Sequence, residues 1–135
     1  MRDMLTADVL FRAKVVYLIL SKDIEEALEL LSYNYEVVAP KLKVGMPKRY
    51  SKNPACYVHN NRTIHVSHRE ILWNPNIILH EFYHHLRSVK NAQGGIEKYA
   101  NTFAKNYLEA YQKITRLIKF YSASKMVIVT VVRYK

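Results

Sequence analysis

The sequence predicts an α+β fold with N-terminal helices, a small mostly antiparallel sheet, two further helices and a β-like C-terminal tail. Dense apolar residues open the chain, residues 62–68 alternate apolar and polar side chains, and helix-start and helix-stop residues bracket residues 75–89. With 135 residues and 50% hydrophobic content, the chain is long enough to bury its own core. We therefore expect one domain over residues 1–135.

The N-terminal part is expected to form two helices. The first covers residues 6–20, and Ser21-Lys22-Asp23 can cap a second one over residues 24–33. Charged side chains interrupt the first apolar stretch, whereas a helix that crosses a membrane needs roughly 20 mostly apolar residues. We expect no membrane span, no signal peptide and a cytoplasmic location, which also suits a single, buried cysteine, Cys56.

The middle of the chain has the pattern of short strands. Residues 37–38 and 42–44 are predicted to be extended, and residues 55–59 and 62–68 are predicted to form a hairpin. Asn60-Asn61 lies between the two hairpin strands, and paired Asn tolerates the positive φ values of a tight turn.

Two more helices are predicted after residue 74. Asn74-Pro75 indicates a helix start, because Asn caps free N–H groups and Pro suits the first helical position. This helix is expected over residues 75–89, and Gln93-Gly94-Gly95 breaks it before a long helix over residues 96–121.

The C-terminal segment after this long helix has two interpretations. Residues 126–132 are apolar and mostly β-branched, which predicts a strand that pairs with the sheet or with another protomer. Alternatively, residues 126–135 lie across a cleft as a segment that keeps the protein latent. We prefer the first interpretation.

A pair of histidines on the third helix indicates a metal site. His80 and His84 are four residues apart, so they lie on one helix face and can converge on one Zn²⁺ at bond lengths of roughly 2.0–2.1 Å. Glu81 adjoins the pair, where a carboxylate can hold a water molecule and take its proton as the water attacks a carbonyl. Gln at this position could hold the water but could not accept its proton.

A catalytic zinc site needs a third protein ligand, and a carboxylate is the best candidate. The metzincin pattern requires a histidine six residues after the second one, but position 90 is Lys90. Glu97 lies 13 residues beyond His84, and two antiparallel helices joined by a short loop would bring these side chains together. Glu109, three turns further along the same helix, is the alternative ligand. His85 points about 100° away from His84, so we expect it on the surface and outside the site.

Small and polar residues next to Glu97 support this choice of ligand. Ala100 and Ala104 share the helix face of Glu97, so the two helices can approach closely. Asn101 lies one turn beyond Glu97, where it could accept a hydrogen bond from the free N–H of a ligand histidine. We therefore prefer Glu97 over Glu109.

The segment His80-Glu81-x-x-His84 followed by Glu97-x-x-Ala100-Asn101 resembles the gluzincin metallopeptidases, whose pattern is His-Glu-x-x-His and then Glu-x-x-Ala-Asp or a close variant. The resemblance covers residues 74–108, and the chain is similar in size to the soluble minimal gluzincins of archaea. It also looks like the repressor-cleaving peptidases of mobile elements. The resemblance implies a zinc-dependent peptidase that acts on a polypeptide, with His80, His84 and Glu97 as zinc ligands and Glu81 as general base. Asn101 departs from the commoner Asp.

The resemblance also implies a place for substrate. In gluzincins, an edge strand before the catalytic helix borders the cleft and pairs with extended substrate. The counterpart here is predicted at residues 62–68, which implies that Val66 and His68 flank bound substrate. A sheet edge suits this task because its unpaired backbone groups can bind a peptide backbone.

The charge distribution supports an alternative function. Residues 1–36 hold four basic and seven acidic residues, a net charge of −3, whereas residues 37–135 hold seventeen basic and four acidic residues, a net charge of +13. A basic body can attract nucleic acid, anionic lipid or acidic polypeptides. The alternative is therefore a non-enzymatic basic module that binds nucleic acid or another anionic partner, with the metal structural or absent. The sequence lacks the stacked aromatic residues expected of such a module, so we favour the peptidase.

Overall fold

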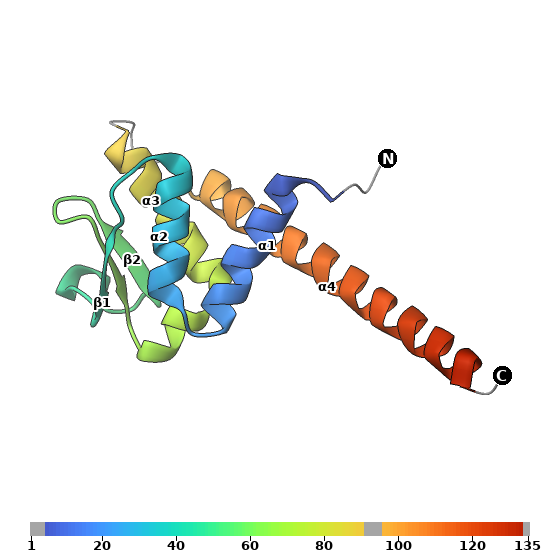
Figure 1. Ribbon diagram of the computed structural model, residues 1–135. Coiled ribbons are helices and arrows are strands. Elements are labelled where there is room, and N and C mark those ends of the chain that lie inside the picture. Colours follow the sequence, from blue (N-terminus) through green and yellow to red (C-terminus); the bar gives the residue numbers. More distant parts are fainter. Residues whose placement is uncertain (1–4, 91–95, 134–135) are drawn as a thin grey trace.

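Four α-helices and one three-stranded sheet form the part of the chain that the computed structural model describes, residues 5–90 and 96–133. The α+β prediction is confirmed (Figure 1). The predicted break at residues 93–95 lies outside the described residues. In chain order the elements, with short 3₁₀ turns marked η, are α1 (Ala7–Leu20), α2 (Ile24–Tyr35), β1 (Lys41–Val44), η1 (Lys48–Tyr50), β2 (Ala55–Val58), β3 (Thr63–Val66), η2 (Arg69–Trp73), α3 (Pro75–Val89) and α4 (Glu97–Arg133).

The ends of the first two helices follow from local residue chemistry. Oγ1 of Thr6 accepts a hydrogen bond from the N–H of Val9 at 3.1 Å, which satisfies a donor that the first turn of α1 leaves free. Asp23 precedes α2 as predicted, although its side chain makes no capping hydrogen bond. Glu36 ends α2 in a left-handed conformation, with φ of 58°. Both helices therefore begin within one residue of the predicted positions.

The sheet has the strand order β1-β3-β2, so β3 lies in the centre. β2 and β3 pair antiparallel as the predicted hairpin, while β1 pairs with β3 in parallel. The chain reverses direction between β1 and β2 and again between β2 and β3, so β1 and β3 run in the same direction. The prediction of a mostly antiparallel sheet is therefore wrong, and the sheet is mixed. Residues 37–38, predicted to be extended, are not part of a strand.

The hairpin turn differs in detail from its prediction. Arg62 takes the positive φ of the turn, at 51°, whereas neither Asn60 nor Asn61 does so. Asn61 instead offers its carbonyl to Oγ1 of Thr63 at 3.0 Å. The residue with positive φ is therefore Arg62, which directly follows the predicted pair Asn60-Asn61.

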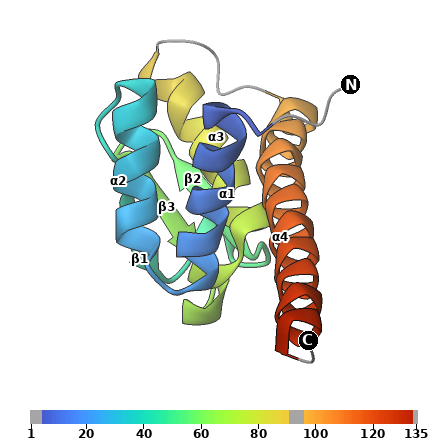
Figure 2. The same ribbon diagram turned by 45° about the vertical axis from the view of Figure 1, so that its right-hand side comes forward.

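The helices pack on one face of the sheet, as Figures 1 and 2 show. Ile64 and Val66 of β3 are fully buried in a cluster that includes Val16 of α1, Leu31 of α2 and Phe82 of α3. Alternate residues of β3 point the other way, so Thr63 and His65 lie on the face turned away from the helices. This arrangement holds α3 firmly between the sheet and α4.

α4 is a 37-residue helix, and it corrects the predicted tail. It continues to Arg133, so the predicted strand over residues 126–132 is wrong. The chain has neither Gly nor Pro after residue 95 to stop the helix, and a helix satisfies its own backbone groups, whereas a strand needs a partner. Figure 1 shows the C-terminal half of α4 leaving the body. Residue 126 therefore lies about 44 Å along the axis from Glu97, too far to cover that residue as a latency segment of the same chain.

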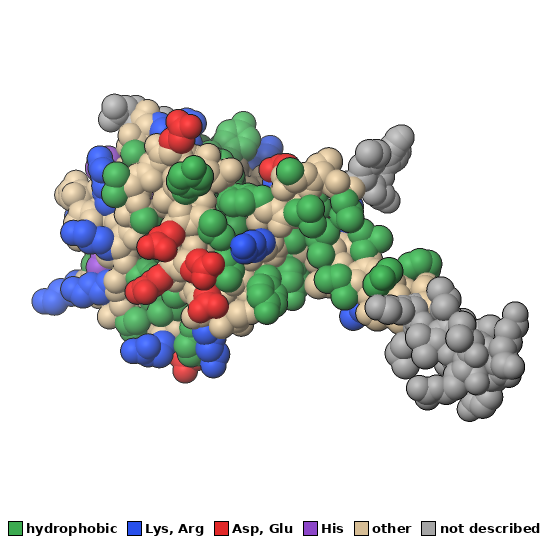
Figure 3. Space-filling model, in the orientation of Figure 1, with side chains coloured by type: hydrophobic (Ala, Val, Ile, Leu, Met, Phe, Trp, Pro, Cys, Tyr) green, Lys and Arg blue, Asp and Glu red, His purple; other side chains and the backbone are tan. Residues whose placement is uncertain are grey.

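The surface is divided by charge and by apolarity. Figure 3 shows acidic side chains gathered over α2, where Glu25, Glu26 and Glu29 are exposed, and Lys and Arg side chains along the side of the sheet. Ile118 and Phe120 are exposed on the projecting part of α4. Within the described part of the chain, no helix combines the length and the apolarity that a bilayer crossing requires.

Candidate metal centre

The helix that carries the histidines begins and ends as predicted. Oδ1 of Asn74 accepts from the N–H of Ile77 at 3.1 Å, and Pro75 occupies the first helical position of α3. Ile78 and Phe82 anchor the helix in the core. This buried face fixes the rotation of α3 and turns His80 and His84 toward the first turns of α4.

His80 and His84 both direct Nε2 at the Glu97 carboxylate. Nε2 of His80 lies 2.8 Å from Oε1 of Glu97, and Nε2 of His84 lies 2.8 Å from Oε2. The two ring centroids are 5.1 Å apart, as expected one helical turn from each other. The three residues offer ligand atoms that all lie within 4.8 Å of one another. The structure therefore brings together the three ligands that the sequence predicts, as a group able to hold a metal ion.

Asn101 decides which nitrogen of His80 faces Glu97. Oδ1 of Asn101 lies 2.8 Å from Nδ1 of His80, and because a carbonyl oxygen only accepts, the ring donates from Nδ1. A neutral ring then has its lone pair on Nε2, facing a carboxylate oxygen at 2.8 Å. Two acceptors at this distance repel each other unless a cation joins them. Either a proton on Nε2 or a metal ion supplies that cation.

The donor set fits zinc. Imidazole nitrogen and carboxylate oxygen are usual zinc ligands, and at bond lengths of roughly 2.0–2.1 Å the donors around a tetrahedral ion lie roughly 3.3 Å apart. The 2.8 Å contacts would widen only slightly to admit the ion. The side chain of Glu97 is 73% exposed, compared with 17% for His80 and 14% for His84, so the carboxylate has room to adjust.

Small residues let α4 approach the histidine helix. Ala100 and Ala104 are completely buried, as predicted for the face that they share with Glu97. Larger side chains pack beyond them: the Phe103 ring lies 5.8 Å from that of Tyr83, and the Tyr83 ring lies edge-on to His84 at 5.7 Å. The aromatic contacts therefore help to fix the orientation of His84.

Glu81 lies buried beside the three donors. Burial raises the pKa of its carboxyl above the ordinary value, the imidazoles of His80 and His84 oppose that rise, and the Glu97 carboxylate adds to it. A carboxylate whose pKa is raised is a stronger base than that of an ordinary surface Glu. Glu81 therefore lies between the two histidines in sequence and beside them in space, and its role as general base stays a prediction.

Glu109 and His85, the other acid and histidine considered for the site, both lie outside the metal group. Glu109 lies about 18 Å along α4 from Glu97 and forms an i,i+4 ion pair with Lys105, so it is not the third ligand. His85 stays outside the metal group, as predicted, but its expected surface position is wrong because the residue is completely buried. Its Nε2 donates to the Val38 carbonyl at 2.7 Å, so Nδ1 accepts from the Tyr57 hydroxyl at 2.8 Å.

The predicted substrate strand is also wrong. β3 is the central strand and has neighbours on both sides, so it offers no free edge. Val66 is completely buried and cannot touch a substrate. His68 is exposed beyond the end of β3, where its Nδ1 lies 3.0 Å from Oγ of the adjacent Ser67. The hairpin pattern predicts a strand here, but whether β3 is an edge strand or a central strand depends on its pairing with β1, which is distant in sequence.

Comparisons with family models, with curated proteins and with solved structures find no match for this chain. The likeness to the gluzincins therefore rests on the two short motifs at residues 80–84 and 97–101.

Proposed function

We propose that this protein is a zinc-dependent peptidase. The observation that supports the proposal is the bridge that one carboxylate makes between two imidazoles: the two oxygens of Glu97 each lie 2.8 Å from one Nε2. Three such donors, one of them a carboxylate, form the ligand set typical of catalytic zinc with a fourth position left for water or substrate. Structural zinc sites usually have four protein ligands instead.

Each residue of the site has a definite task in the proposed reaction. Zinc, when bound, supplies a Lewis acid that polarises a carbonyl and makes water acidic near neutral pH. Glu81 accepts the proton of the attacking water and delivers it to the leaving amine. Asn101 keeps His80 in the tautomer that presents Nε2, and the Tyr83 ring holds His84 in place.

The free edge of β2 is the proposed binding site for the peptide backbone, in place of β3. β2 runs beside α3, because Tyr57 contacts His85 and His59 contacts Ser88. The thiol of Cys56, whose pKa burial raises, is close enough to Glu81 for the carboxylate to raise it further. β2 therefore borders the side of α3 where Glu81 lies.

Hydrogen-bond alternation identifies the free backbone groups of this edge. The N–H of Ser67 donates to the carbonyl of Pro54 at 2.8 Å, so Cys56 and Val58, two and four residues on, also face β3. Ala55 and Tyr57 then direct their N–H and C=O groups away from the sheet. An extended peptide could add to them as a fourth strand, which supports a polypeptide substrate.

Zinc content and hydrolysis of fluorescein-labelled casein test the proposal. Wild type is expected to bind one zinc ion and to cleave casein. Glu81→Gln should keep its zinc and lose at least about 100-fold in rate, because general-base catalysis typically contributes this much. Glu97→Gln should lose zinc, whereas the control Glu109→Gln, on the same helix, should keep both zinc and activity. Wild-type rates in Glu81→Gln, or a wild type that binds no zinc, would overturn the proposal.

A basic module without enzymatic activity is the second candidate function. Residues 37–69 contain seven Lys or Arg residues and no Asp or Glu, which favours an anionic partner. Salt-sensitive binding of DNA or RNA by a protein without stoichiometric zinc would support this candidate over the peptidase.

A further inference from the structure

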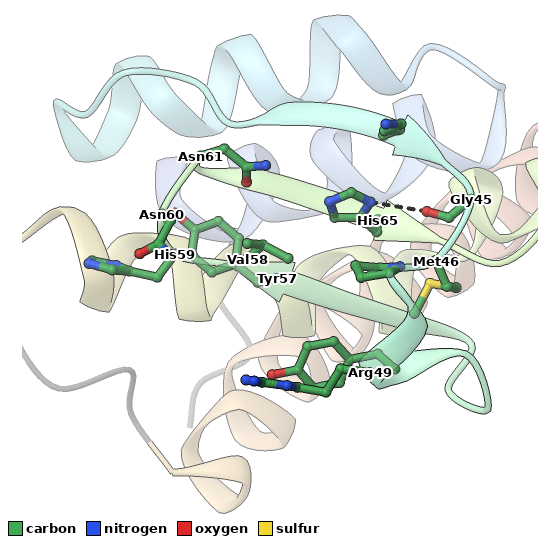
Figure 4. Close-up of a pocket in the computed structure, with 12 residues that line it drawn as sticks. Gly45, Met46, Arg49, Tyr57, Val58, His59, Asn60, Asn61 and His65 are labelled. Atoms are coloured by element: carbon green, nitrogen blue, oxygen red, sulfur yellow. Dashed lines mark hydrogen bonds between the residues drawn. The ribbon is translucent and has the colours of Figure 1, made fainter.

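A hollow of about 760 Å³ lies on the side of the sheet away from the helices (Figure 4). β3 contributes His65 to it, β1 contributes Lys43, and residues 45–47 and 49–50, which follow β1, form one wall. The hairpin turn at residues 59–61 closes the other end. His65 alternates with the core residues Ile64 and Val66, so the hollow and the metal centre belong to opposite sides of the sheet.

Two basic side chains and no acidic side chain line the hollow. Lys43 and Arg49 are its Lys and Arg residues, and none of the residues that line it is Asp or Glu. Among the described residues, no carboxylate forms an ion pair with either cation. A concave surface with unneutralised cations on two walls attracts an anion.

His65 supplies a second, independent feature of a ligand site. Its side chain is only 6% exposed, and Nδ1 lies 3.0 Å from the carbonyl oxygen of Gly45, so the ring donates from Nδ1. Gly45 has φ of 123°, which residues with a side chain rarely adopt and which aims this carbonyl at the ring. Nε2 of His65 is buried without a hydrogen-bond partner. Figure 4 shows it on the side of the ring away from Gly45, among the residues that line the hollow.

A buried polar atom without a partner costs free energy, so it indicates a group that binds there. A neutral His65 ring presents a lone pair at Nε2 because Nδ1 carries the proton. The missing partner must therefore donate a hydrogen bond to Nε2 of the neutral ring. Otherwise it must be an anion that accepts a hydrogen bond from Nε2 of the protonated ring.

We propose that this hollow binds a phosphorylated small molecule of nucleotide size. A phosphate group has a second pKa of about 6, so it can share one proton with Nε2 of His65 in either direction while its other oxygens accept from Lys43 and Arg49. A carboxylate satisfies Nε2 only when the ring has taken up a proton. The volume lies within the range of roughly 300–1,000 Å³ that is typical of small-molecule sites and exceeds the needs of a single ion.

The test measures the binding of ATP, pyrophosphate and citrate to the full-length protein by calorimetry, after removal of metal and of chelator, so that phosphate cannot bind at the metal centre. Saturable binding of ATP and pyrophosphate is expected, with citrate at least about tenfold weaker. Lys43→Ala and Arg49→Ala should each weaken ATP binding about tenfold or more, because each removes a charge-assisted hydrogen bond. His65→Phe should reduce the preference for pyrophosphate over citrate.

Two matched controls separate a built site from a diffuse basic surface. Lys41→Ala changes the same strand as Lys43→Ala, and Lys48→Ala changes the same turn as Arg49→Ala, but neither residue lines the hollow. Both controls should change ATP binding by less than about twofold. Equal losses in the two controls would overturn the proposal, as would citrate binding as tight as pyrophosphate, tighter binding of a single-stranded oligonucleotide than of ATP, or no saturable binding. Unchanged ATP binding in Glu97→Gln would show that the hollow acts independently of the metal centre.

Discussion

Oδ1 of Asn101 accepts a hydrogen bond from Nδ1 of His80 at 2.8 Å, and Nε2 of the same imidazole faces the Glu97 carboxylate. Asn101 and Glu97 lie one turn apart on α4, so one helix face supplies both the ligand and the group that orients another ligand. An Asp at this position would add a negative charge behind the imidazole. Asn supplies the acceptor without the charge.

Asn101→Ala is expected to weaken zinc binding by about 10–100-fold, because the imidazole loses the partner that fixes its orientation and tautomer. Asn101→Asp keeps the acceptor and should bind zinc at least as tightly as wild type. Competition against a chromophoric chelator measures both affinities. Zinc affinity that is equal in wild type and Asn101→Ala would show that the hydrogen bond to His80 is not needed for metal binding.

The metal ligands could be predicted because their geometry is local. Residues four apart on a helix always share a face, and a short connection to a second helix limits where Glu97 can lie. The helix bounds at Asn74 and Pro75 likewise depend on adjacent residues. Such features need no knowledge of distant segments.

Apart from the hairpin turn at residues 60–62, the failures of prediction depend on which distant parts of the chain come together. The sequence predicts Val66 on an edge strand, but β1 pairs along the other side of that strand. The sequence predicts His85 on the surface, but the ring is buried and hydrogen-bonds to the carbonyl of Val38, 47 residues earlier. Residues 126–132 have the composition of a strand, yet they form helix because no partner strand competes with the continuing backbone hydrogen bonds of α4.

Ala100→Leu is expected to damage both stability and the metal centre. Ala100 is completely buried where α4 meets α3, so a larger side chain must push the helices apart. Overpacking of this kind typically costs about 1–3 kcal/mol in free energy of unfolding, and it should also weaken zinc binding because Glu97 lies on the same face. Urea denaturation and zinc titration measure the two effects. The control Asn106→Leu, at an exposed position of the same helix, should leave both unchanged.

His85→Ala should lower the free energy of unfolding by at least about 2 kcal/mol, because it leaves the Val38 carbonyl and the Tyr57 hydroxyl without their partner and opens a cavity. Burial also lowers the pKa of His85, which keeps the ring neutral and able to accept from Tyr57. The matched control is His68→Ala, which removes an exposed ring that hydrogen-bonds to its neighbour Ser67 and should stay within about 0.5 kcal/mol of wild type. Urea denaturation of metal-free protein measures both. Equal stabilities in the two variants would contradict a structural role for His85.

Ala55→Pro tests the free edge of β2 as the place where substrate backbone binds. Proline removes the outward N–H of Ala55 but leaves the hydrogen bonds between β2 and β3 intact, and an edge strand tolerates it there. Loss of one backbone hydrogen bond to the substrate should reduce kcat/KM by about 3- to 10-fold, mainly through KM, with zinc content unchanged. Val44→Pro is the control on the opposite edge: Gly45 donates its N–H to β3 at 2.7 Å, so the N–H of Val44 points outward from β1. Both variants remove an N–H that points outward from an edge strand, but only the one beside Glu81 should slow peptide hydrolysis. Equal rates for Ala55→Pro and wild type, with both folded, would mean that substrate does not add to β2.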